Sequence, residues 1–292
     1  MWSTLLPLIA AVGYAFSVML VKRAMAHGVG TVRSLFVANL AKGLIGCCLL
    51  LFAARDIPWA QAWQPLLAAL GFMGGQIFTF LAIRAGDTSV VTPIMGTKPL
   101  FVGLGSALFF RVMPDPSLWL AVVLAMIAIF LLSCGDIRSN KGTAPAVALA
   151  LIASVTFGAT DSMVGAWGAT FSPFAFLGLL FGAVGLLSFG LIPLFREPLR
   201  AIEAAGWPWL LGGAGVMAGQ ALLLGTAMAV FGEATRANVL YSSRGIWSLV
   251  LVVLLGAWLQ NREASAPRHI LILRLAGACL LTVALALALL TP

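Results

Sequence analysis

Long apolar runs separated by short polar segments dominate the chain. A helix needs about 20 apolar residues to cross the hydrocarbon core of a bilayer, and by that rule the pattern predicts ten membrane-spanning helices. The spans are expected at 3–21, 33–53, 65–83, 88–110 and 117–134 in the first half, and at 145–166, 173–195, 208–230, 234–258 and 269–290 in the second. The predicted fold class is therefore an all-α membrane protein.

The same pattern occurs twice along the chain. The segment Leu-Ala-Ala-Leu-Gly-Phe-Met-Gly-Gly-Gln, which ends at Gln76, returns as Leu-Gly-Gly-Ala-Gly-Val-Met-Ala-Gly-Gln, which ends at Gln220. Farther along, Lys98 corresponds to Arg244 at nearly the same offset. Self-similarity over half the chain predicts two homologous halves, each with five of the predicted spans.

Five is an odd number, and this decides how the two halves are related. A chain that crosses the membrane five times ends on the side opposite to its start, so the second repeat is inverted relative to the first. We therefore predict two inverted repeats, 1–135 and 145–292, joined by a loop at 136–144. Inverted repeats are typical of secondary transporters, whose substrate site lies in a central cavity between the repeats.

Composition agrees with a membrane protein and removes other classes. Hydrophobic residues make up 62% of the chain and charged residues 9%, whereas about a quarter of the residues in soluble domains are charged. The net charge of +8 resides mostly in short loops, where basic residues set orientation. The predicted partners are membrane lipid and a small-molecule substrate, with no nucleic acid, and a monomer is expected.

Two sequence motifs resemble a known family. The first half opens with Leu-Ile-Ala-Ala-Val-Gly-Tyr-Ala-Phe-Ser, and the fourth predicted span contains Thr-Lys-Pro-Leu-Phe around Lys98. With the five-plus-five repeat, these segments resemble the EamA-type members of the drug/metabolite transporter (DMT) superfamily, and within it the YddG-type amino-acid exporters. The resemblance implies ten helices around one cavity, export of small metabolites, and coupling to protons or to exchange.

The predicted function follows from the repeats and from this resemblance. We expect a secondary-active exporter of neutral or aromatic amino acids, or of similar metabolites, in the bacterial cytoplasmic (inner) membrane, working by alternating access. A channel or a lipid flippase on the same scaffold is the alternative. An enzyme is not expected, since the spans contain a single carboxylate and no histidine apart from His269 at the start of the tenth. No cofactor and no metal site are predicted.

The side of the membrane on which the termini lie has two opposing indications. The loops opposite the termini contain most of the lysines and arginines, and the positive-inside rule then favours termini outside the cell. The family resemblance implies cytoplasmic termini instead.

Four polar residues at matched positions of the repeats are candidates for substrate binding. Charged groups near the middle of a span cost roughly 2.5–3.5 kcal/mol to insert, so each requires a reason. Lys98 and Arg244 lie near the middle of their spans and are expected to attract a substrate carboxylate. Gln76 and Gln220 provide amide donors and acceptors, which suit either a zwitterionic substrate or contacts between helices.

Other residues complete the predicted site. Asp161 is the only carboxylate inside a predicted span, which makes it the candidate for proton coupling; pairing with Lys98 or Arg244 is the structural alternative. Apolar walls are expected from aromatic residues, namely Tyr14, Phe157, Tyr241 and Trp247.

Proline and glycine predict local features of the helices. Pro93 and Pro99 are expected to break the fourth span beside Lys98, because each proline removes a backbone N–H. Pairs of glycines spaced by four residues are expected to let helices approach closely; they are Gly71 with Gly75 and Gly215 with Gly219.

Overall fold

The fold consists of helices throughout the part of the chain that the structure describes. The structure is a computed structural model and describes residues 1–53, 57–85, 88–133, 143–255 and 268–290. Within these residues ten helical stretches are long and apolar enough to cross a membrane, which confirms the predicted number. The first five comprise α1 (Trp2–Ala26), α2 (Thr31–Ala53), α3 (Trp63–Ala85), α4 (Thr88–Met95), α5 (Lys98–Phe110) and α6 (Pro116–Ser133). The second five comprise α7 (Thr143–Phe171), α8 (Pro173–Leu187), α9 (Trp207–Phe231), α10 (Ala234–Tyr241), α11 (Arg244–Leu255) and α12 (Arg268–Leu290).

Several helices extend beyond the predicted apolar runs. For example, α7 continues to Phe171, whereas the apolar run predicted an end at 166. The apolar run measures only the hydrocarbon thickness, and a helix can continue into the interfacial region. Short 3-10 segments lie outside the α-helices, at η2 (Trp59–Gln61), η3 (Ser188–Leu194), η4 (Leu199–Ala201) and η5 (Ala204–Gly206). The predicted loop at 136–144 lies mostly outside the described residues, as does the predicted end of the ninth span at 256–258.

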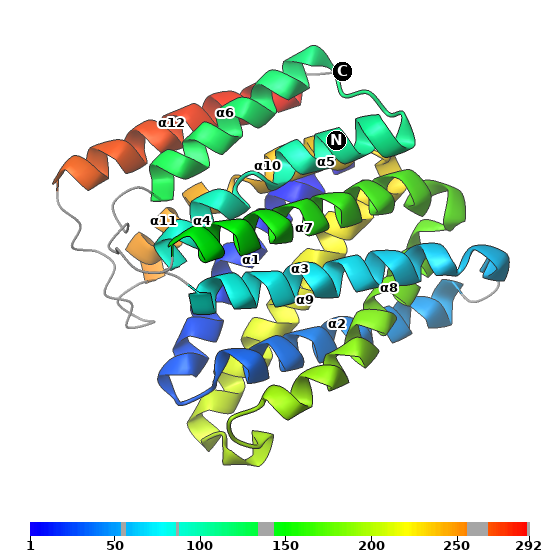
Figure 1. Ribbon diagram of the computed structural model, residues 1–292, viewed down its shortest axis with the longest axis vertical. Coiled ribbons are helices and arrows are strands. Elements are labelled where there is room, and N and C mark those ends of the chain that lie inside the picture. The colour runs from blue at the N-terminus through cyan, green and yellow to red at the C-terminus, as the bar shows by residue number, and fades with distance from the viewer. Residues whose placement is uncertain (54–56, 86–87, 134–142, 256–267, 291–292) are drawn as a thin grey trace.

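The main helix contacts are symmetric between the two halves: each main contact of a first-half helix is matched by the same contact of its second-half counterpart. Helix α1 packs against α9, and its counterpart α7 packs against α3. Helix α2 packs against its own counterpart α8, and α6 packs against its counterpart α12. In Figure 1, α6 and α12 lie side by side at one edge of the molecule, and α2 and α8 lie at the opposite edge. A two-fold relation between halves of five spans requires an axis in the membrane plane, as inverted repeats have.

Glycines allow close backbone contact between the two halves. A Cβ atom on Gly46 of α2 would lie 2.5 Å from the backbone nitrogen of Gly182 in α8, and one on Gly43 would lie 2.9 Å from Cα of Gly185. Real Cβ atoms do not approach other atoms this closely, so only glycine fits at these positions. The α2–α8 contact therefore depends on close approach of the two helix backbones.

The predicted glycine pairs differ from one another. Gly71 and Gly75 of α3 face α7, where an added Cβ would lie 2.5 Å from the Thr160 hydroxyl and 2.8 Å from the Phe157 ring, respectively. Gly215 and Gly219 of α9 have nothing within 4 Å of an added Cβ. The close-packing prediction is confirmed for the first pair and wrong for the second, because spacing alone does not show which face of a helix meets a neighbour.

Candidate substrate-binding site

Two of the ten spans are each made of two helices, and each break is followed by a cation. The fourth span is divided into α4 and α5, and Lys98 is the first residue of α5. The ninth span is divided into α10 and α11, and Arg244 is the first residue of α11. Both half-helices therefore begin within a span, where their N-terminal dipoles add to the positive charge of the side chains.

The break before Lys98 is held by hydrogen bonds from neighbouring side chains. The carbonyl oxygen of Ile94 accepts from the Thr97 hydroxyl at 2.7 Å and from the Ser154 hydroxyl of α7 at 3.1 Å. Pro99 occupies the first turn of α5, where its missing N–H costs little. The break agrees with the prediction for Pro99, whereas Pro93 lies inside α4 and does not end it. A carbonyl freed at such a break must find another donor at membrane depth.

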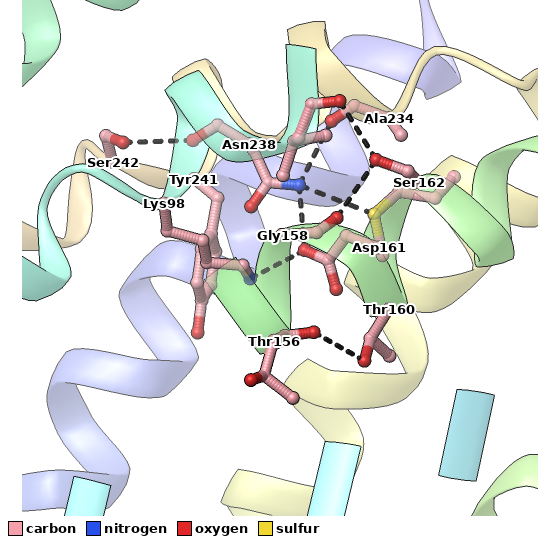
Figure 2. Close-up of polar contacts among 12 residues, drawn as sticks. Lys98, Thr156, Gly158, Thr160, Asp161, Ser162, Ala234, Asn238, Tyr241 and Ser242 are labelled. Carbon is pink, nitrogen blue, oxygen red and sulfur yellow. Dashed lines mark hydrogen bonds and ion pairs between the residues drawn. The ribbon is translucent and has the colours of Figure 1, made fainter. Parts of the chain in front are cut away.

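Lys98 forms an ion pair with Asp161. Its Nζ lies 2.6 Å from Oδ2 of Asp161, and the two side chains are only 12% and 7% exposed. The Nδ2 of Asn238 donates to the same carboxylate oxygen at 2.8 Å. Figure 2 shows these three residues together, contributed by α5, α7 and α10. The ion pair thus connects the two repeats and neutralises the charge of Lys98 with a charge-assisted hydrogen bond.

Arg244 has a different environment, made of aromatic rings. Its guanidinium carbon lies 4.9 Å from the ring centroid of Tyr14 and 4.7 Å from that of Tyr241. The two rings are 5.9 Å apart in an edge-to-face arrangement. Among the described residues, no carboxylate forms an ion pair with Arg244. The guanidinium is therefore held by cation–π contacts.

The hydroxyl next to Arg244 also lacks a partner. Ser243 is 2% exposed, and its Oγ forms no hydrogen bond with any residue that the structure describes. A buried polar group without a partner costs free energy, so it indicates either strain or a position where a ligand binds. The beginning of α11 therefore presents two groups that can donate hydrogen bonds, one of them charged.

Gln76 and Gln220 are held by different neighbours. Gln76 of α3 exchanges two hydrogen bonds with Asn39 of α2, at 2.8 and 3.0 Å, and Lys42 donates to the same Asn39 oxygen at 3.0 Å. Gln220 of α9 accepts from the Tyr241 hydroxyl at 2.9 Å. The amide of Gln76 thus connects two helices of one repeat, and Gln220 orients a ring that touches Arg244.

Aromatic rings connect the two predicted cations. The Nζ of Lys98 lies 5.8 Å from the ring centroid of Phe157 and 5.9 Å from that of Tyr241. Tyr241 therefore lies between Lys98 and Arg244 and touches both. Trp247 is on α11 at 37% exposure and takes no part in these contacts. The structure thus brings together most of the predicted site residues: Lys98, Asp161, Phe157, Tyr241, Arg244, Tyr14 and Gln220.

Sequence reasoning did not identify Asn238 or Ser243. Asn238 precedes Tyr241 by three residues, so the two side chains share one side of α10. That spacing was the available signal for Asn238. For Ser243 the sequence gives no signal beyond its position beside Arg244. Within the described ranges, no group of three histidine, cysteine or acidic residues could hold a metal ion.

The sequence and the fold were compared with known proteins. Residues 1–134 match the model of the EamA-like transporter family. Among the matching solved structures, one titled "Crystal structure of protein" superposes with a TM-score of 0.77 at 18% sequence identity, covering 99% of this chain and 98% of that chain. At this identity the likeness shows a shared fold. The comparison with curated proteins gave no match. The family match covers residues 1–134, and the ten helices long and apolar enough to cross a membrane indicate a multi-pass membrane protein.

Proposed function

We propose that the protein is a secondary-active exporter of small metabolites that carry a carboxylate, with neutral and aromatic amino acids as candidates. We place it in the bacterial cytoplasmic membrane and assign it an alternating-access mechanism. The observation that carries the proposal is Arg244: a cation at a helix break, between two tyrosine rings, with no carboxylate partner among the described residues.

The chemistry of Arg244 suits a carboxylate ligand. A guanidinium offers a planar fork of N–H donors that matches the two oxygens of a carboxylate. Tyr14 and Tyr241 both contact the fork, and Gln220 fixes Tyr241 through its hydroxyl. Phe157, Tyr14 and Tyr241 supply apolar walls for the rest of the substrate. Trp247 and Gln76 stay candidate contacts for a conformation in which the repeats have moved.

The Lys98–Asp161 pair supports a proposal for coupling. The pair spans the boundary between the repeats, so any rocking of one repeat against the other acts on it. Protonation of Asp161 would remove its charge and leave Lys98 free for the substrate anion. Asp161 is thus the proposed proton carrier. In Asp161→Asn, transport should lose its dependence on pH; an unchanged pH profile would reject this role.

Transport in liposomes tests the main proposal. Purified protein should catalyse saturable counterflow of a labelled carboxylate, and Arg244→Gln should abolish most of it. Arg111→Gln is the matched control, since Arg111 lies beyond the end of α5, is exposed and contacts none of the site residues. Conductance without saturation would indicate a channel, and movement of labelled lipid a flippase. Either result, without counterflow, would overturn the proposal.

A further inference from the structure

We infer that the site selects organic anions that lack a compensating positive charge, such as 2-oxo acids and simple carboxylates, over zwitterionic amino acids. This inference rests on the proposed function and narrows its substrate class. It follows from the balance of charges around the helix breaks and from the partners that those charges already have.

Cations outnumber carboxylates at the centre of the molecule. Lys98 and Arg244 flank the two breaks, and Lys42 of α2 is a third cation, only 2% exposed. Asp161 is the one carboxylate within the described spans. With these groups ionised, the formal excess is two positive charges. An unbalanced charge inside a membrane protein is costly, and a bound anion reduces the cost.

Lys42 is connected to the other two cations by a series of rings. Its Nζ lies 5.5 Å from the ring centroid of Phe72, which stands 5.6 Å from that of Phe157. Phe157 in turn contacts the Nζ of Lys98. The one hydrogen bond of the Lys42 ammonium to a described residue goes to the neutral Asn39 side chain. Lys42 therefore adds its charge to the same region without bringing a carboxylate.

The ammonium group of an amino acid would have to share its partner with Lys98. Both partners of Asp161, the Lys98 ammonium and the Asn238 amide, point to one oxygen, and the charge of the carboxylate is already balanced by Lys98. Protonated Asp161 would be neutral and would not attract an ammonium either. Among the described residues of the spans, the site thus offers a second positive charge no carboxylate that is not already paired with a cation.

The aromatic rings do not replace that missing carboxylate. A ring face can bind an ammonium through its quadrupole. In this site each ring already contacts a cation of the protein: Tyr14 contacts Arg244, Phe157 contacts Lys98, and Tyr241 contacts both. A substrate ammonium would have to displace one of these cations or lie beside it, and like charges repel at such distances.

Groups that can donate to an anion are, by contrast, in surplus. Arg244 has no carboxylate partner, and the buried Ser243 hydroxyl has no hydrogen bond, in the part of the chain that the structure describes. Both stand at the start of α11, where the helix dipole also favours negative charge. An arginine without a carboxylate partner among the described residues and a neighbouring buried hydroxyl without a hydrogen bond match a ligand that only accepts.

Matched ligands separate the two substrate classes. Phenylalanine, phenylpyruvate, 3-phenylpropanoate and phenethylamine share a ring and differ in the carboxylate and the ammonium; the pairs leucine with 4-methyl-2-oxopentanoate and alanine with pyruvate repeat the comparison at smaller sizes. Competition against counterflow should show at least tenfold tighter apparent binding of the ammonium-free acids, and no competition by phenethylamine. Amino acids that compete as well as their oxo acids would overturn the inference while leaving the transporter proposal intact. A lack of counterflow with every pair would overturn both.

A charge variant adds an independent test. Gln76→Glu places a carboxylate beside Asn39 and Lys42 and lowers the formal excess to one positive charge. The ratio of oxo-acid to amino-acid binding should fall severalfold in this variant and stay unchanged in Arg111→Gln. An unaltered ratio in Gln76→Glu, in protein that still catalyses counterflow, would contradict the charge argument.

Discussion

Lys98 and Arg244 occupy matched positions in the two repeats, yet their surroundings differ. Each begins the second half of a broken span. Lys98 is neutralised by Asp161 at 2.6 Å, whereas Arg244 lies between two tyrosine rings with no carboxylate partner among the described residues. Duplication has therefore kept the position of a positive charge and changed what it pairs with. One cation joins the repeats, and the other stays available.

The repeat itself explains the difference. At the offset that relates Leu8 to Leu151, the residue of the first repeat that corresponds to Asp161 is Val18. Lys98 pairs with Asp161, and the residue that would pair with Arg244 by symmetry is Val18. Because Val18 is apolar, Arg244 lacks an equivalent carboxylate. The same offset relates Tyr14 to Phe157, so Tyr14, which contacts Arg244, carries a hydroxyl that Phe157, which contacts Lys98, lacks.

The largest expected effect is on stability. In Lys98→Gln the Asp161 carboxylate stays buried without its cation, which should lower the free energy of unfolding by about 3–5 kcal/mol. Arg244→Gln leaves no buried acid behind and should cost about 1–2 kcal/mol through lost cation–π contacts. Thermal unfolding of both variants in detergent measures the difference. Adding Asp161→Asn to Lys98→Gln should restore most of the loss; equal losses in the two single variants would remove the distinction between the cations.

Transport should be more sensitive to Arg244→Gln than to Lys98→Gln, the reverse of the order for stability. Hydrogen bonds to a charged group contribute about 1.5–3 kcal/mol, so Arg244→Gln should lower kcat/KM for a carboxylate substrate by roughly 10–100-fold. Arg244→Lys keeps the charge but loses the planar fork, and a value between wild type and Arg244→Gln is expected. Initial rates of counterflow provide the measurement. If Arg244→Lys matched wild type, a fork-like contact with the substrate would be excluded.

Two matched glycines, Gly75 and Gly219, allow the packing of the two repeats to be compared, with a smaller expected effect on stability. Gly75→Ala places a Cβ 2.8 Å from the Phe157 ring, while its counterpart Gly219→Ala meets nothing within 4 Å. Overpacking typically costs about 1–3 kcal/mol, and a substitution into open space about 0.5 kcal/mol or less. Apparent melting temperatures should therefore fall for Gly75→Ala and stay near wild type for Gly219→Ala. Similar shifts for both would mean that these two helix faces are equally packed.

The smallest effect concerns the two glutamines. Hydrogen bonds between helices in membranes average about 0.6 kcal/mol in double-mutant cycles. Cycles on Asn39 with Gln76, and on Tyr241 with Gln220, should each give a coupling energy near that value. Only the second cycle should also change transport, since Tyr241 touches Arg244. A transport effect confined to the Asn39–Gln76 pair would reverse the roles assigned to the two amides.

Sequence patterns predicted the spans well because bilayer thickness alone sets the length of an apolar run. They also predicted the break in the fourth span, which lies beside Pro99, although Pro93 is inside α4. The ninth span breaks at Ser242 and Ser243 without a proline, so the sequence did not predict this break.

The partners of the charges were harder to predict. Asp161 and Asn238 are 77 residues apart along the chain, and no local pattern shows that two membrane helices meet at those positions. Spacing also cannot distinguish the packed glycines of α3 from the open ones of α9. An aromatic residue such as Trp247 can face lipid as readily as substrate, and its role stays a prediction.

The crosswise packing of the repeats has a consequence for biosynthesis. Because α3 packs against α7 and α1 against α9, the helices made first lack their main packing partners until the second half leaves the ribosome. During that interval Lys98 is in the membrane before Asp161 and Asn238 have been translated, at an insertion cost of about 2.5–3.5 kcal/mol. A nascent chain halted after residue 134 should therefore stay beside the insertion machinery or be degraded, and release into lipid should follow synthesis of the sixth to ninth spans.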